Sequence, residues 1–242
     1  MFFSSPWIRK PDFPANGQFD YNAYWETRGW KIAKGLKPRE QLIYSAIPAG
    51  ARVIDIGCGN SRLPVALKEK GVAITVADVA PKVLEGYKTF GISGHQIDLT
   101  AIEQHTLTET YDYIIMSEVL EHVANPEEVI LILKQYTRQF VITVPNSAAY
   151  LFRFGLMFKG RFFTQWVMHP SEHVRYWSHL DFMDWLTAMG ITVTTVSVTD
   201  GFTFRGLLPW LPNLWKNFLG FRMMYVCEVK SKGQNANSKN AD

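Results

Sequence analysis

A run of apolar residues that ends in two closely spaced glycines constrains this chain most: residues 53–61 read VIDIGCGNS. The β-branched residues predict a buried strand, and Gly57 and Gly59 predict a turn with few steric limits. The residues that follow, 61–70, predict a helix that Gly71 ends. Asp55 places a carboxylate at the end of the strand, where it can accept hydrogen bonds from a cationic amine. This unit therefore predicts a ligand site built on backbone between a strand and a helix.

Strand and helix signals alternate along most of the chain. Seven short apolar runs predict strands: Arg52–Ile56, Ala73–Ala77, His95–Ile97, Tyr111–Ser117, Phe140–Val144, Ile191–Thr199 and Met223–Val229. Helices are predicted between strands at residues 61–70, 81–90, 126–136 and 179–189. This alternation predicts an α/β fold, with a Rossmann-like seven-stranded, mostly parallel sheet and helices on both faces. No helix is predicted between the last two strands, so the last strand is expected to run antiparallel at a hairpin-like edge.

The length of 242 residues suits one such domain. Residues 1–47 are expected to form an N-terminal arm followed by cap helices, with a break near Pro38. The ligand-binding domain is expected over residues 48–230, with insertions at 146–178 and 200–222 that interrupt the rhythm of strands and helices. Residues 231–242 are rich in Lys, Asn and Ser and are expected to be disordered.

Composition limits the classes of partner. The formal charge is +3, and the basic residues are scattered rather than gathered in a stripe, so a nucleic-acid partner is not expected. The two cysteines have neither metal-site spacing nor the density of a disulfide framework, which favours a reducing, cytoplasmic setting. The first residues do not have the pattern of a signal peptide, and no run of 18 apolar residues predicts a membrane span.

The residues around the glycine turn limit the class of ligand that it can bind. A dinucleotide-binding turn has the pattern G-x-G-x-x-G/A, but Arg62 stands at its last position and disfavours a NAD-dependent oxidoreductase. A phosphate-binding loop is excluded because no G-K-[ST] follows.

Carboxylates follow the next strands as well. Asp78 ends the second predicted strand, where it can accept both hydroxyls of a ribose. Asp98 follows the third strand, where it can bind an adenine amino group while Leu99 packs on the ring. The fourth strand runs into residues 118–123, EVLEHV. The order of these groups along the chain predicts a nucleoside site at the carboxyl ends of the strands.

These motifs resemble those of class I S-adenosylmethionine (SAM)-dependent methyltransferases, of the type 11 and type 23 kind, over roughly residues 20–229. The resemblance implies SAM as cofactor and S-adenosylhomocysteine as product. It assigns the methionine part to Asp55, Gly57 and Gly59, the ribose to Asp78, the adenine to Asp98 and Leu99, and a place beside the methionine end to Ser117. Arg28, on the expected N-terminal helix, could bind the SAM carboxylate. One departure is Ser61, which stands where the family usually has a third glycine.

Residues 118–122 allow two interpretations of how the acceptor is activated. His122 is the candidate general base for an oxygen or nitrogen nucleophile. Glu118, Glu121 and His122 would share one face if the segment were helical, and with His169 or His173 they could hold a divalent metal ion. Some O-methyltransferases of quinone precursors and of small-RNA 3′ ends use a similar arrangement.

Residues 144–182 partly resemble the MetW-type branch, which is associated with methionine biosynthesis. The position of His173, Arg175 and Tyr176 implies a substrate pocket. The methyl acceptor is expected to be a small or lipid-like molecule, with possible peripheral membrane contact through residues 207–221. The alternative is a non-catalytic, MetW-like SAM-binding accessory protein that acts with a partner enzyme. The sequence does not define the acceptor, the oligomeric state or the pathway.

Overall fold

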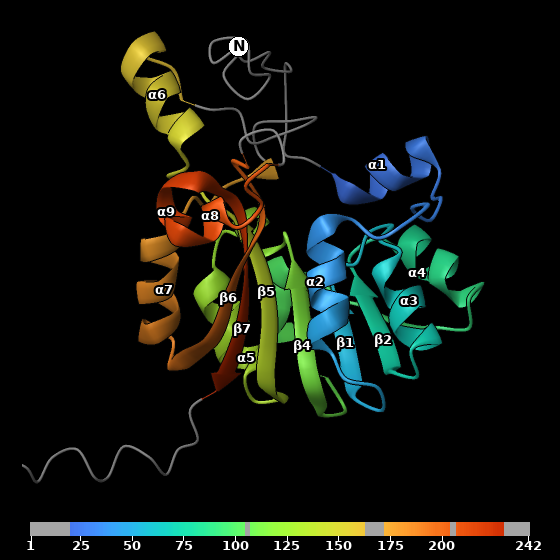
Figure 1. Ribbon diagram of the computed structural model, residues 1–242. Coiled ribbons are helices and arrows are strands. Elements are labelled where there is room, and N and C mark those ends of the chain that lie inside the picture. Colours follow the sequence, from blue (N-terminus) through green and yellow to red (C-terminus); the bar gives the residue numbers. More distant parts are fainter. Residues whose placement is uncertain (1–19, 105–106, 163–171, 204–206, 230–242) are drawn as a thin grey trace, which may run out of the picture.

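The strands form one seven-stranded sheet in the computed structural model, which describes residues 20–104, 107–162, 172–203 and 207–229 (Figure 1). Their bounds are β1 Arg52–Ile56, β2 Ala73–Asp78, β3 Ser93–Gln96, β4 Tyr111–Ser117, β5 Thr137–Pro145, β6 Ile191–Gly201 and β7 Gly220–Val229. The order across the sheet is β3-β2-β1-β4-β5-β7-β6. The first five strands are parallel, and β7 lies antiparallel between β5 and β6. The predicted α/β fold with an antiparallel last strand is confirmed.

The helices cover both faces of this sheet, because its central strands are apolar on both faces. The α-helices are α1 Tyr21–Arg28, α2 Pro38–Ala46, α3 Leu63–Glu69, α4 Pro81–Lys88, α5 Pro126–Leu133, α6 Tyr150–Lys159, α7 His179–Ala188, α8 Leu211–Leu214 and α9 Lys216–Leu219. Two short 3-10 helices, η1 Leu99–Gln104 and η2 Leu120–His122, follow β3 and β4. Helices α1 to α4 pack on one face, and α5 and α7 pack on the other.

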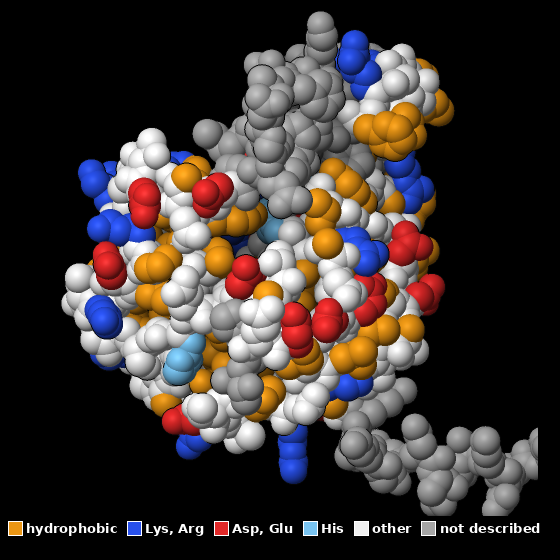
Figure 2. All heavy atoms as spheres, turned by 180° about the vertical axis from the view of Figure 1, so that it is seen from behind, with side chains coloured by type: hydrophobic (Ala, Val, Ile, Leu, Met, Phe, Trp, Pro, Cys, Tyr) orange, Lys and Arg blue, Asp and Glu red, His pale blue; other side chains and the backbone are white. Residues whose placement is uncertain are grey.

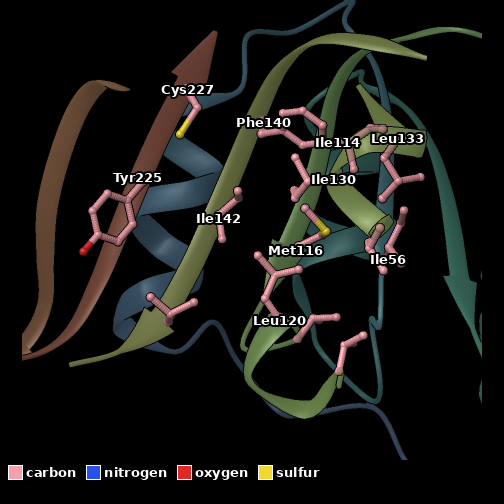
Figure 3. Packing of buried hydrophobic residues seen from close by; sticks show 14 of the residues in the cluster. Ile56, Ile114, Met116, Leu120, Ile130, Leu133, Phe140, Ile142, Tyr225 and Cys227 are labelled. Atoms are coloured by element: carbon pink, nitrogen blue, oxygen red, sulfur yellow. The ribbon is translucent and has the colours of Figure 1, made fainter. Parts of the chain in front are cut away.

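Two apolar cores separate these layers. Figure 3 shows part of the core beneath α5 and α7, where Ile130 and Leu133 of α5 meet Ile114, Met116 and Phe140 of the sheet. Burial of such side chains contributes about 1.5–3 kcal/mol each. Because both faces are covered, the carboxyl ends of the parallel strands are the natural place for a ligand.

The structure corrects three details of the predicted elements. The helix predicted from residue 61 begins at Leu63, and the third strand is displaced to Ser93–Gln96. The expectation of no helix between the last two strands is wrong, since the short helices α8 and α9 lie between β6 and β7. The insertion predicted at 146–178 contains the ten-residue helix α6, which extends away from the sheet in Figure 1. The predicted arm at residues 1–19 and the tail at 231–242 lie outside the described residues.

Among the helices of the described ranges, none is both long and apolar enough to cross a bilayer. Helix α1 lies beyond the carboxyl ends of β1 and β2, over the glycine turn (Figure 1).

Candidate active site

The glycine turn after β1 is held in a conformation that other residues rarely adopt. Gly57 has φ 71° and Gly59 has φ 52°. The amide of Gly57 donates to the Ala77 carbonyl of β2 at 2.7 Å. A Cβ on Gly57 would lie 2.6 Å from Cγ2 of Val119, so the turn has no room for a side chain there. The glycine therefore serves both the backbone angle and the packing of the turn on the segment after β4.

A tryptophan holds the same turn from the N-terminal side. The indole nitrogen of Trp30 donates to the Gly59 carbonyl at 3.0 Å, and its ring packs over Gly86 of α4. Asn60 donates to the Lys31 carbonyl at 2.9 Å. Trp25 of α1 is buried, and its ring would lie 3.6 Å from a Cβ on Gly59. The segment after α1 is thus fastened to the turn.

Ser61, which stands in place of the third glycine, precedes α3. Its hydroxyl accepts from the amide of Leu63 at 3.0 Å, which satisfies one of the free amides at the start of a helix. Its carbonyl accepts from the hydroxyl of Tyr87 at 2.7 Å. The serine is accommodated by local hydrogen bonds, and the turn keeps its shape.

Two buried carboxylates follow the first two strands. Asp78 is 7% exposed; one oxygen accepts from the Gly59 amide and the other from the Ala80 amide, both at 3.0 Å. Burial raises the pKa of Asp78, and these amides oppose the rise. Burial also raises the pKa of Asp55, with further contributions from Glu40 and Asp78. Arg39 opposes that rise in the pKa of Asp55.

The remaining predicted cofactor residues lie at the same edge of the sheet. Asp98 follows β3, and its carboxylate accepts from the Thr100 amide at 2.8 Å. Leu99 opens η1 and packs against the core beneath α5. Ser117 ends β4, and its hydroxyl lies 3.1 Å from that of Thr143 on β5.

Arg28 bonds a residue of its own helix. It is exposed on α1, where its guanidinium bonds the hydroxyl of Tyr24 and lies 5.5 Å from the centre of that ring. Arg39, in the first turn of α2, instead lies beside Ser117, with Nε donating to the hydroxyl at 3.3 Å. Sequence reasoning missed Arg39, although the expected helix break near Pro38 was the signal that could have placed it.

A cavity of about 360 Å³ opens at the end of β5. Pro145, Leu151, Phe152 and Phe221 form an apolar part of its lining. The polar part includes Lys37, Arg39, Glu118, Glu121, His122 and His173. In the view of Figure 2 a histidine lies in a hollow bordered by hydrophobic side chains.

His122 lies at the polar side of this cavity. Its Nδ1 bonds the Glu172 carbonyl and lies 3.0 Å from the hydroxyl oxygen of Tyr21. A carbonyl can only accept, so Nδ1 carries the proton and Nε2 keeps a lone pair. Burial lowers the pKa of His122, and the Glu172 carbonyl opposes this. The ring of His173 meets that of His122 edge to face, with centroids 4.6 Å apart. Burial, then His122 and Arg222, lower the pKa of His173 to about 3.

The two glutamates of the same string have different surroundings. Glu118 has φ 59°, a rare angle for a residue with a side chain. Its carboxylate accepts from Nε of Arg222 at 3.2 Å and from the Thr143 hydroxyl at 3.4 Å. Glu121 is 1% exposed, and neither of its carboxylate oxygens has a hydrogen-bond partner among the residues that the structure describes. Burial, together with Glu118, raises the pKa of Glu121 well above its usual value.

The helix assumed for the string at 118–122 is wrong. The segment turns sharply at Glu118 and then forms the single 3-10 turn Leu120–His122. The three side chains that converge are Glu121, His122 and His173, with one potential ligand atom from each lying within 4.8 Å of the others. His169, the other residue considered for a metal, lies outside the described residues.

The three residues predicted for the substrate pocket separate in the structure. His173 lines the cavity. Arg175 instead donates to the Ala124 carbonyl at 2.8 Å and to the Glu127 carboxylate at 3.0 Å, which ties the loop before α7 to the start of α5. Tyr176 is half exposed and donates to the His173 carbonyl at 3.1 Å. Sequence reasoning missed Arg222 and Glu172 as residues of this cavity, although Glu172 directly precedes the predicted His173.

The order of these groups on the sheet defines a class. A glycine turn after β1, acids after β1, β2 and β3, and a parallel sheet closed by an antiparallel β7 make this the fold of class I SAM-dependent methyltransferases. The chain belongs to the family of the methionine biosynthesis protein MetW, whose model matches residues 37–227.

Solved structures and curated relatives agree with this fold. A TehB-like SAM-dependent methyltransferase from Corynebacterium glutamicum has a TM-score of 0.54 and 17% identity, covering 86% of this chain and 94% of that one. Magnesium protoporphyrin IX methyltransferase from Synechocystis, with bound SAM, has a TM-score of 0.51 and 14% identity, covering 89% and 87%.

The curated relatives are named ubiquinone biosynthesis O-methyltransferase. The protein from Xylella fastidiosa (strain 9a5c) is 34% identical over 140 residues, which are 53% of this chain and 57% of the relative. That from Xanthomonas axonopodis pv. citri is 26% identical over 190 residues, or 73% and 78%. This chain spans about half the length of the Xylella fastidiosa relatives that it matches.

Proposed function

We propose that this protein transfers the methyl group of SAM to an acceptor held in the 360 Å³ cavity. One observation carries the proposal: a glycine turn fastened to Asp78, and a cavity lined by His122, both lie at the carboxyl edge of the sheet. In this proposal the turn is the cofactor cradle, and it lies beside a pocket that contains both apolar and titratable groups. The methyltransferase fold and the names of the relatives support the same activity.

The residues present fit SAM. Gly57 is exposed and Gly59 is half-buried, so backbone of the turn is accessible to a ligand, and Asp78 offers a buried carboxylate of the kind that binds a ribose. We propose that Asp98 and Leu99 hold the adenine, and that Asp55 and Ser117 lie at the methionine end. Arg39, beside Ser117, is better placed than Arg28 to bind the carboxylate of the cofactor.

SAM supplies an activated methyl group, so the protein mainly has to position the acceptor in line with it. An oxygen or nitrogen acceptor must also lose a proton. We propose that this happens at His122, whose Nε2 keeps a lone pair because Nδ1 donates to the Glu172 carbonyl. His122 could act directly as the base, or it could hold an ion that acidifies the acceptor.

We further propose that the acceptor has an apolar part and is met at a lipid surface. Exposed apolar side chains on α6, on α8 and at the two ends of α8 form an apolar collar near the cavity: Leu156, Met157, Phe158, Trp210, Leu214 and Trp215. The two halves of the collar are linked by ring contacts, since Phe218 of α9 lies against Phe154 of α6 and stacks on Trp215. Residues 150–162 and 207–219 carry four basic residues and no acidic one, which suits an anionic surface.

The collar adjoins the cavity through α6 itself. Leu151 and Phe152, in the first turn of that helix, line the cavity, while Leu156, Met157 and Phe158 further along it are exposed. In Figure 2 this helix carries hydrophobic and basic side chains. A molecule with an apolar tail could therefore pass from a bilayer to the cavity along one helix. The names of the curated relatives, which refer to ubiquinone biosynthesis, support an acceptor of this kind.

A titration tests the cofactor proposal. The purified protein is titrated with SAM, S-adenosylhomocysteine and NADH by calorimetry, and again as Asp78→Ala. Binding of the first two in the micromolar range, lost in the variant and absent for NADH, is the expected result. No binding of SAM or S-adenosylhomocysteine would contradict the proposal. If the protein binds SAM but methylates no acceptor by itself, and methylation occurs only when a partner enzyme is added, the accessory role that the MetW family name suggests would be favoured.

Two further measurements test the acceptor side. An alkylated catechol serves as a probe acceptor, because it combines a hydroxyl with an apolar tail. His122→Asn should lower the rate of methyl transfer to this probe by about 10²–10⁴-fold while the affinity for SAM stays the same. Vesicles containing anionic lipid should retain the native protein, and the double variant Leu214→Glu/Trp215→Glu should no longer bind them. Equal vesicle binding by the native protein and the double variant would contradict a role for the collar.

A further inference from the structure

Asn146, which directly follows β5, donates to the end of a short helix. It is 1% exposed, and its side-chain nitrogen lies 3.3 Å from the carbonyl oxygen of Lys216 and 3.2 Å from that of Asn217, both in α9. The bond to the carbonyl of Gly220, just after α9, is 2.7 Å. A four-residue helix has carbonyls that no amide within the helix can reach. Asn146 therefore supplies donors that hold the end of α9.

The side-chain oxygen of Asn146 fixes the starts of two other helices. It accepts from the amide of Ala148, just before α6, at 3.0 Å and from the amide of His179, the first residue of α7, at 3.2 Å. The bond from Ala148, two residues along the chain, forms an Asx turn, by which asparagine redirects a chain. The backbone carbonyl of Asn146 also accepts from the Ala149 amide at 3.3 Å. One buried residue thus joins α6, α7 and α9.

The apolar wall of the cavity is built from the segments that Asn146 joins. The wall consists of Pro145, Leu151, Phe152 and Phe221. Pro145 directly precedes Asn146, and Leu151 and Phe152 lie in the first turn of α6. The backbone amide of Asn146 donates to the Phe221 carbonyl at 2.8 Å. Each wall residue is therefore next to Asn146 in the chain, in the helix that Asn146 starts, or bonded to Asn146.

Ring contacts extend this arrangement to α9. Phe221 stacks on Tyr150 of α6, with ring centroids 5.6 Å apart, and the Tyr150 ring also lies 5.8 Å from that of Phe218 in α9. Because protein interiors are close-packed, a shift of α9 would displace these rings. The bonds that hold the end of α9 therefore also keep the wall in place.

We propose that Asn146 is a positioning residue for the acceptor, because it holds α6, α9 and β7 in the arrangement that gives the cavity its apolar wall. The identification of this cavity as the acceptor site rests on the function proposed above. Asn146 is not among the described residues that line the cavity, so it acts through the segments that it binds. The glycine turn proposed for the cofactor lies between β1 and α3. Loss of Asn146 should therefore weaken binding of the acceptor and leave the affinity for SAM unchanged.

Two substitutions of Asn146 divide its contacts. Asn146→Ser keeps a hydroxyl that can accept from the Ala148 amide but is too short to reach α9, whereas Asn146→Ala removes both sets of bonds. Calorimetry with the alkylated catechol, in the presence of S-adenosylhomocysteine, measures the affinity for the acceptor without requiring turnover. We expect the Kd of this probe to rise by about tenfold in Asn146→Ala and by about threefold in Asn146→Ser. The KM of the probe should rise by the same factors, with kcat within about twofold of the native value.

Asn217→Ala is the control at the same junction. The side chain of Asn217 accepts from the His179 amide at 3.0 Å, and Asn146 shares that amide, so one acceptor remains after the substitution. The Kd of the probe should stay within about twofold of the native value. Circular dichroism establishes that each variant is folded at the temperature of the titration. If Asn146→Ala is not folded, Asn146→Ser decides by the same comparison.

Equal affinity for the probe in the native protein and in the folded Asn146 variants would overturn the proposal. A loss of SAM affinity or of kcat as large as the loss of probe affinity would also overturn it, because a positioning role on the acceptor side changes only the constants of the acceptor. Turnover separates this inference from the proposed function. A native protein that binds the probe but does not methylate it would count against the proposed function, while the Kd values would still test Asn146. A native protein that does not bind the probe would contradict both.

Discussion

The contact between Gly86 and Trp30 yields a prediction whose sign opposes helix propensity. Gly86 lies inside α4, where replacement by alanine ordinarily stabilises a helix by about 0.5–1 kcal/mol. Here a Cβ would meet the indole ring of Trp30, with Cζ3 at 2.6 Å. Overpacking of this kind costs about 1–3 kcal/mol. We therefore expect Gly86→Ala to lower the free energy of unfolding by about 1–2 kcal/mol.

The displaced ring should also weaken cofactor binding. Trp30 donates to the Gly59 carbonyl, and loss of one such hydrogen bond is worth about 0.5–1.5 kcal/mol. If loss of this hydrogen bond destabilises the binding conformation of the turn by the same free energy, the affinity for SAM falls by roughly two- to tenfold. Urea unfolding followed by circular dichroism measures the stability, and calorimetry measures the affinity.

Two controls isolate the contact. Gly35→Ala introduces the same methyl group where nothing lies within 4 Å, so stability and affinity should stay near the native values. In a Trp30→Ala background the ring is gone, and Gly86→Ala should become neutral or stabilising, which a double-mutant cycle reads directly. Stabilisation by Gly86→Ala in the native background would refute the reasoning.

The remaining predictions concern the start of α3 and the cysteines. Ser61→Ala and Ser61→Gly both remove the acceptor for the Leu63 amide, and each should cost about 0.5–1.5 kcal/mol in urea unfolding. Both variants should bind SAM within about threefold of the native protein, and a tenfold loss in either would show that the hydroxyl contacts the cofactor. Cys58 and Cys227 are both buried. Burial raises the pKa of the Cys227 thiol to about 12, so only a small fraction of this thiol is ionised at pH 8. A thiol reagent should label the native protein at least about 100-fold more slowly than the urea-unfolded chain, and rapid labelling in native buffer would contradict this burial.

The fold could be predicted from sequence because its signals are local. The parallel strands β1, β2, β4 and β5 contain short apolar runs, whereas β3 is polar and its predicted bounds were displaced. The glycines after β1 permit the positive φ that the structure shows. The helices α8 and α9 escaped prediction because each spans only four residues, too few for a periodic pattern. The antiparallel last strand was predictable because the chain between β6 and β7 lacks a long crossover helix.

The site was harder to predict because its residues meet across long separations in the chain. Spacing alone grouped Glu118 with Glu121 and His122, as if on a helix, but the positive φ at Glu118 directs its carboxylate to Arg222. His173 then takes the third place beside Glu121 and His122, 51 residues after His122 in sequence numbering. Periodicity carries no information about a contact of that kind, because a loop and not a regular element brings the side chain in.

Helix α1 connects the two halves of the site. Its first residue, Tyr21, reaches the ring of His122 at the acceptor cavity, and Trp25 covers Gly59 at the cofactor turn. Trp30, just beyond the helix, bonds the same turn. Any movement of this segment that opened the cofactor turn would therefore also remove a contact of His122. Access for the cofactor is thus linked to the position of His122 in the acceptor cavity. Substitutions in α1 should therefore change the affinity for the cofactor and the affinity for the acceptor together.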